Sequence, residues 1–267
     1  INALKIVGKP IDEAQVVFIG SGAANVAITR LCFKAGVDPA KCRVVDSQGI
    51  LHEKRQDLYM RRAEFVDKWR LCQMTNAEGR TGGMAEALAG ADVCIAVSKP
   101  GPGTIQPEWV STMAHDAIVF ACANPVPEIW PWEARAAGAR IVATGRSDFP
   151  NQVNNSLGFP GIFRGALDVR AKTITDEMCL AAAHALAGAA PDGGMDPECI
   201  LPTMVEWEVY AREAVAVGMM AQQQGIARLA IDEETLFKHA AEMILRSRRL
   251  TQVMMESGLI PEPPPAE

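Results

Sequence analysis

Short apolar runs alternate with helical patterns over the first half of the chain, between residues 16 and 143. Each run is three to five residues long and mostly apolar, as expected of strands buried on both faces of a parallel sheet. The pattern predicts an α/β fold: a doubly wound parallel sheet, Rossmann-like, covered by helices. The expected strands are Val16–Ile19, Arg43–Val45, Val93–Val97, Ile118–Ala121 and Ile141–Ala143, and the expected helices between them include Leu58–Leu71, Gly83–Ala89, Pro107–Met113 and Pro131–Ala137.

The second half of the chain carries helical patterns only, which predict C-terminal helices after the sheet. They lie at Phe159–Leu167, Val205–Gln223 and Asp232–Met255, and one more begins at Thr175 as its N-cap. The expected domains are a dinucleotide-binding domain at 1–187, a helical extension at 188–260 and a disordered tail at 261–267. Residues 1–8 have the pattern of the last turns of a helix, so residues 1–14 are expected to continue from an upstream domain.

Two glycines one residue apart end the first apolar run, in Gly20-Ser21-Gly22-Ala23-Ala24-Asn25. A helical pattern follows at once, so a strand is expected to turn tightly into a helix whose first amides lack partners. Such amides, with the helix dipole, form a seat for a pyrophosphate. Asn25 occupies the third position of the usual G-x-G-x-x-G, so the match is incomplete. This motif alone does not exclude the alternative, a strand, turn and helix that bind no ligand.

Asp46 ends the second apolar run, 26 residues after Gly20. A carboxylate at about this spacing binds the adenosine ribose in dinucleotide-binding βαβ units. Ser47 and Gln48 follow it with no immediate cation, which favours NAD over NADP. Lys54 and Arg55 are close enough along the chain to leave NADP open.

Composition and charge narrow the class of protein. The chain has 267 residues, 49% hydrophobic composition and a net charge of −6, which disfavours a nucleic-acid partner. Its seven cysteines form no CxxC pair, and its four histidines share no ligand spacing, so we expect free thiols and no metal site. No run of 18 apolar residues and no signal peptide is found, so we expect no membrane partner and a cytoplasmic protein.

Polar segments rich in glycine and proline follow three of the expected strands, where the fold places its ligands. Asn124 precedes two prolines that stiffen its backbone, and Asn154 and Asn155 lie in a later segment of this kind. A rigid carboxamide both donates and accepts, which suits a nicotinamide amide or a substrate carboxylate. Glu128 is expected to orient its turn, and Asp148 to brace its loop, rather than to act in catalysis.

With these segments in view, the chain resembles malic enzymes, in particular the shorter bacterial type. The resemblance is carried by ATGRSDFPNQVNN at 143–155, FPGIFRGAL at 159–167, ANPVPEI at 123–129 and the glycine turn, and it covers most of residues 1–187. The family implies oxidative decarboxylation of malate to pyruvate and CO₂, with NAD, or alternatively NADP, and a divalent Mg or Mn ion. It also implies a homo-oligomer, a dimer or larger.

The resemblance implies the following roles. Asn124 and Asn155 would bind the substrate and the nicotinamide, Asp46 the ribose, and Ser98 the cofactor. Gly20, Ser21, Gly22, Ala23, Ala24 and Asn25 would hold the pyrophosphate. The family's tyrosine acid, lysine base and acidic metal ligands would lie upstream of Ile1, so we expect no catalytic residue and no turnover of malate by this chain alone.

Two other functions stay open. One is a non-catalytic module that binds NAD or regulates a partner. Asn25 and the long turn from Ser98 to Gly103 would then be marks of divergence from the enzymes. The other is a dehydrogenase of hydroxy acids that does not decarboxylate its substrate.

Overall fold

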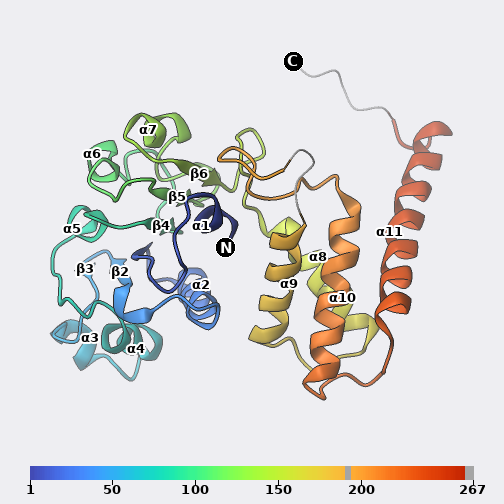
Figure 1. Ribbon diagram of the computed structural model, residues 1–267, viewed down its shortest axis with the longest axis horizontal. Coiled ribbons are helices and arrows are strands. Elements are labelled where there is room, and N and C mark those ends of the chain that lie inside the picture. Colours follow the sequence, from blue (N-terminus) through green and yellow to red (C-terminus); the bar gives the residue numbers. More distant parts are fainter. Residues whose placement is uncertain (190–193, 262–267) are drawn as a thin grey trace. The chain divides into compact units, whose positions relative to one another are not determined.

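The computed structural model describes residues 1–189 and 194–261, and the chain divides into two compact units (Figure 1). Unit 1 comprises Ile1–Asn154 and Ala190–Pro202, and unit 2 comprises Asn155–Ala189 and Thr203–Glu267. These units are not the expected domains, whose limits at 1–187 and 188–260 stay predictions. The expected tail at 261–267 lies, apart from Pro261, outside the described residues.

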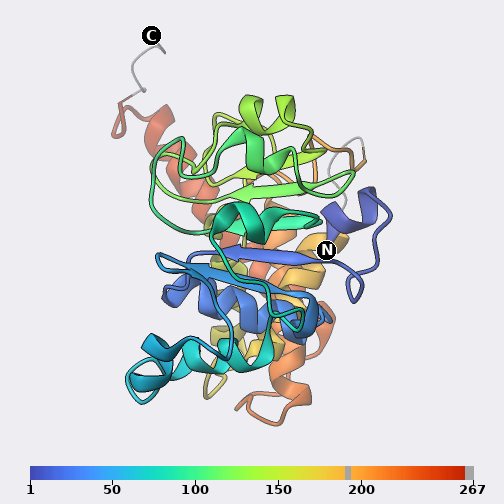
Figure 2. The ribbon, with the colours of Figure 1, turned by 90° about the vertical axis from the view of Figure 1, so that its left-hand side faces the viewer.

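Unit 1 is built on a six-stranded sheet in the order β3-β2-β1-β4-β5-β6, whose strands lie side by side in Figure 2. All neighbours pair in parallel except β3, which runs antiparallel to β2. The order reverses direction at β1, so the expected doubly wound sheet is confirmed. The strands are β1 (Val16–Ile19), β2 (Arg43–Asp46), β3 (Gly49–Ile50), β4 (Val93–Ala96), β5 (Ile118–Ala121) and β6 (Ile141–Thr144).

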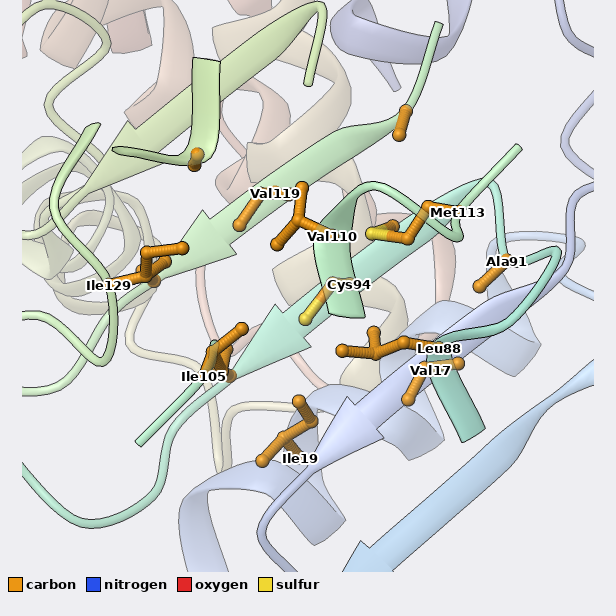
Figure 3. Close-up of a cluster of buried hydrophobic side chains, with 14 of the residues drawn as sticks. Val17, Ile19, Leu88, Ala91, Cys94, Ile105, Val110, Met113, Val119 and Ile129 are labelled. Carbon is orange, nitrogen blue, oxygen red and sulfur yellow. The ribbon is translucent and has the colours of Figure 1, made fainter. Parts of the chain in front are cut away.

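Both faces of this sheet are buried, because alternate residues of each strand enter different cores. Val17 and Ile19 point into one cluster with Leu88 and Ile105 (Figure 3), and Phe18 points into the other. The helices of unit 1 are α1 (Asn2–Ile6), α2 (Ala23–Lys34), η1 (Pro39–Lys41), α3 (Gln56–Met60), α4 (Val66–Met74), α5 (Met84–Leu88), α6 (Pro107–Val110) and α7 (Pro131–Ala136).

The predicted helix at Leu58–Leu71 is wrong in one respect, because the structure divides it into α3 and α4. Between them the chain turns: Arg61 pairs with Glu64 at 2.6 Å, and Phe65 leaves helical geometry with φ −106° and ψ 52°. The apolar spacing continues across this turn, so the sequence pattern does not reveal the break.

Unit 2 is helical: η2 (Asn155–Leu157), α8 (Phe159–Asp168), α9 (Asp176–Gly188), α10 (Trp207–Gln223) and α11 (Glu233–Glu256). The side chains of Thr175 and Asp232 accept from backbone amides and begin α9 and α11, as the sequence predicts for Thr175. α10 contacts α8, α9 and α11. Within the described residues, no helix is both long and apolar enough to cross a membrane.

Candidate functional site

A pocket of about 740 Å³ opens at the carboxyl ends of β1 and β2, at the point where the strand order reverses. In open α/β sheets this is where ligands bind. Its lining includes Gly20, Ser21, Gly22, Ala23 and Asp46, together with Arg30, Phe65, Lys68 and Lys99. The structure therefore brings the glycine turn and the expected ribose carboxylate to one cavity.

The two glycines of the turn have different tasks. Gly20 has φ +99°, and a Cβ there would lie 2.6 Å from the Val97 carbonyl oxygen, so only glycine lets β1 turn beside β4. Gly22 has open space around the position of an added Cβ. It is the N-cap of α2 and brings no capping side chain, so the first amides of this 12-residue helix lack a side-chain acceptor. The geometry suits an anion.

Asn25 fastens the first turn of α2 to the end of β1. It is 1% exposed, and its Nδ2 donates to the carbonyl oxygens of Ile19 at 3.0 Å and Gly20 at 2.8 Å. The missing third glycine is thus replaced by an amide that uses the close approach for hydrogen bonds. Asn25 and Ala24 are not among the residues that line the pocket.

Asp46 already has three donors around its carboxylate, which is 6% exposed. Arg55 donates to both oxygens at 3.1 and 3.2 Å, Lys68 lies 3.4 Å from Oδ2, and the Gln48 amide donates at 2.9 Å. Asp57 also binds Arg55, and this hydrogen bond lowers the pKa of Asp57 to about 2. Sequence spacing indicated Arg55 as a nearby cation but gave no signal for Lys68.

Ser98 contacts a buried carboxylate rather than lining the pocket. The Ser98 amide and hydroxyl donate to Glu128 Oε1 at 2.8 and 3.0 Å, and the Ala123 amide donates to Oε2 at 3.0 Å. Glu128 is fully buried and so joins the loop after β4 to the loop after β5. The sequence predicted that Glu128 orients its turn; the bond to a second loop had no sequence signal.

The two candidate asparagines belong to different units. Asn124, in unit 1, is exposed, and a Cβ on Gly145 would lie 3.2 Å from its Oδ1. Arg146 pairs with Asp148 at 2.6 Å and donates to the Pro125 carbonyl at 3.0 Å, so Asp148 braces this loop as expected. Asn155, in unit 2, is the first residue of η2 and is exposed. Their roles in binding stay predictions.

A metal site is not evident in the part of the chain that the structure describes. Its histidine, cysteine and acidic side chains form no group of three or more that could hold a metal ion. Burial raises the pKa of the Cys32 and Cys72 thiols to about 11, so these thiols stay protonated at neutral pH.

Comparison with known proteins identifies the family. Residues 1–223 match the family described as malic enzyme, NAD binding domain. The chain is 44% identical over 228 residues to the NAD-dependent malic enzyme of Geobacillus stearothermophilus, covering 85% of this chain and 45% of that protein. It is 39% identical over 243 residues to the NADP-dependent malic enzyme of Halomonas elongata, covering 85% of this chain and 55% of that one.

A solved structure shows the same fold. The malic enzyme of Entamoeba histolytica superposes with a TM-score of 0.95 at 47% sequence identity, over 98% of this chain and 54% of that one. This chain therefore spans about half the length of the relatives that it matches.

Proposed function

Because the chain belongs to the malic enzyme NAD-binding domain family, we propose that it holds NAD or NADP while malate is oxidatively decarboxylated to pyruvate and CO₂. The observation that carries this proposal is the pocket shared by the glycine turn and Asp46. The amides that begin α2 would bind the pyrophosphate, and Asp46 would accept from the adenosine ribose. The bound nicotinamide would take the hydride from C2 of malate.

The other roles follow from the family resemblance. Asn124 and Asn155 would bind the substrate and the nicotinamide amide through their carboxamides. Glu128 would hold the loops after β4 and β5 in fixed positions relative to each other. We also propose a divalent Mg or Mn ion whose ligands lie outside this chain, a homo-oligomer, and a cytoplasmic location.

We propose that the chain prefers NAD to NADP, because of the residues at the adenosine end of the pocket. A 2′-phosphate placed near Asp46 would meet a carboxylate whose two cations, Arg55 and Lys68, are already paired with it. Lys68 also lines the pocket and is the cation that could turn from Asp46 to such a phosphate. Titrating the chain with NADH and NADPH tests this: NADH should bind more tightly, and Lys68→Ala should weaken NADPH more than NADH.

The experiment that tests the function is a NADH titration of the wild-type chain and Gly22→Asp. An Asp side chain has room at position 22, so the variant should fold, but its carboxylate would occupy the phosphate seat. We expect affinity to fall at least about tenfold, the effect of roughly 1.4 kcal/mol. Gly188→Asp, which also adds its Cβ in open space but at the end of α9, is the matched control. Equal affinity in both variants would contradict the proposal.

A further inference from the structure

In the described part of unit 2, one buried carboxyl group has no partner for one of its oxygens. Glu213, on α10, is 1% exposed, and its Oε2 has no hydrogen-bond partner among the described residues. A buried ionised carboxylate is costly unless donors compensate it, so such a group is kept neutral. Burial accordingly raises the pKa of Glu213 to about 8.

The surface that faces Glu213 is the glycine side of α8, which Figure 1 shows beside α10. A Cβ on Gly161 would collide with Glu213 Oε2 and would lie 2.7 Å from Glu213 Cβ. A Cβ on Gly165 would collide with the Ala214 carbonyl oxygen. The first turn of α8 is therefore in direct contact with the carboxyl group, and no side chain separates them.

The same turn continues into η2, which begins at Asn155. A Cβ on Gly158 would lie 3.5 Å from Glu213 Oε1 and 4.0 Å from the Asn155 carbonyl oxygen. The Gly158 amide donates to that carbonyl at 3.1 Å, and the Ile162 amide donates to the Gly158 carbonyl at 3.1 Å. Backbone hydrogen bonds thus link Gly158, which lies against Glu213, to Asn155 in η2 and to Ile162 in α8.

The charged and titratable groups around Glu213 are engaged elsewhere. Tyr210, one turn earlier on α10, donates its hydroxyl to the Met204 carbonyl at 3.3 Å. Arg248, on α11, donates to the Val205 carbonyl at 3.1 Å. On α8, Arg164 Nη2 pairs with Asp168 Oδ1, while Arg164 Nε and Asp168 Oδ2 are buried without a partner among the described residues. α9 contributes Met178 and Ala182 to the neighbouring core. In the described part of unit 2, no observed contact gives an ionised Glu213 a compensating cation.

We propose that Glu213 is a positioning residue: its neutral carboxyl fixes the first turn of α8 and thereby Asn155, and its ionisation releases both. The inference rests on the proposed function, in which Asn155 binds the substrate and the nicotinamide. It predicts that the affinity for the cofactor falls in mildly alkaline solution, because the buried carboxyl of Glu213 loses its proton. Glutamine at position 213 keeps the neutral shape and cannot ionise.

The test is hydrogen–deuterium exchange of residues 155–165 in the wild-type chain and in Glu213→Gln, compared at the same pH. At pH 4, where the carboxyl is protonated in both the closed and the open segment, the two should exchange alike. At pH 9, where a carboxyl with this pKa is about 90% ionised, wild-type amides should exchange about tenfold faster than those of the variant. Glu208→Gln, an exposed position on the same helix, is the control and should follow the wild type. Glu213→Met supplies a second neutral side chain and should behave as Glu213→Gln does.

NADH affinity over the same pH range supplies the functional readout. Wild-type affinity should fall several-fold between pH 7 and pH 9, and that of Glu213→Gln should stay level. Equal exchange of wild type and Glu213→Gln at pH 9, or a parallel loss of NADH affinity in both, would overturn the inference. A wild-type chain that binds no NADH at any pH would overturn the proposed function, while the exchange comparison would still decide the role of Glu213.

Discussion

Glu128 in unit 1 and Glu213 in unit 2 are both buried glutamates, but their surroundings differ. In unit 1, Glu128 accepts three hydrogen bonds, from the Ser98 amide, the Ser98 hydroxyl and the Ala123 amide. In unit 2, Oε2 of Glu213 has no partner among the residues that the structure describes, and burial raises the pKa of Glu213 to about 8. Backbone amides can replace water around a carboxylate, as they do at Glu128, whereas the described residues around Glu213 offer no such donor to Oε2.

Because of this difference, Glu128 acts as a structural clamp that joins two loops, whereas Glu213 is a buried group that keeps its proton. Glu128 lies at the carboxyl edge of the sheet, and it contributes to stability through the donors that it satisfies. Glu213 lies against glycines, and its packing depends on staying neutral. Removing the carboxylate should therefore damage unit 1 and, at alkaline pH, should help unit 2.

The largest expected effect is that of Glu128→Ala. It would leave the three donors of Glu128 without their acceptor and create a cavity, so we expect a loss of roughly 4 kcal/mol in the free energy of unfolding. Urea denaturation at pH 7 measures it. Glu108→Ala, at an exposed position on α6, is the control and should change stability by about 0.5 kcal/mol or less. A loss below about 1 kcal/mol in Glu128→Ala would show that the clamp contributes little.

The next largest effect is the pH dependence of Glu213→Gln. Below the ordinary glutamate pKa of 4.5 the carboxyl is protonated in both states, and between there and about 8 only the folded chain keeps the proton. Wild-type stability should therefore fall with rising pH across this window. We expect Glu213→Gln to unfold like the wild type near pH 4 and to be more stable by roughly 3 kcal/mol at pH 7. Thermal unfolding at both pH values measures this; a constant difference would be evidence against the buried proton.

Asn25→Ala tests whether a half-satisfied polar group still contributes. Nδ2 makes two hydrogen bonds to the end of β1, while Oδ1 has no partner among the described residues. We expect a loss of about 1 to 2 kcal/mol, with weaker NADH binding because the phosphate seat loses its anchor. Thr29→Ala, which removes one bond to the Asn25 carbonyl, should lower stability less and leave NADH affinity unchanged. The same NADH affinity in Asn25→Ala as in the wild type would separate this anchor from binding.

The smallest effect is expected from Ser98→Ala, which removes one of the three donors of Glu128. The two backbone amides remain, so the free energy of unfolding should fall by about 1 kcal/mol. Urea denaturation beside Ser111→Ala, whose hydroxyl is exposed and bonds within α6, measures the difference. A loss as large as that of Glu128→Ala would mean that the hydroxyl, and not the amides, holds the carboxylate.

The strands and the glycine turn could be predicted because their signals are local. An apolar run such as Ile118–Ala121 marks a strand buried on both faces, and Gly20 and Gly22 mark the turn by their spacing. β3 has two residues and so offers no pattern to detect. The site contacts that were missed join residues far apart in sequence, as Lys68 joins Asp46.

Glu213 could not be predicted for another reason. It lies within the helical pattern of α10, and a glutamate in such a pattern normally faces solvent. Only the glycines of α8, about 50 residues earlier in the chain, bring a second helix close enough to bury it.

The most direct test of the account is to titrate the ¹⁵N-labelled chain with NADH and follow the amide resonances. The account predicts saturable shifts of the Gly22, Ala23 and Ala24 amides, because these donors begin α2 and would receive the pyrophosphate. Saturable shifts confined to other residues, with these three amides unmoved, would contradict it.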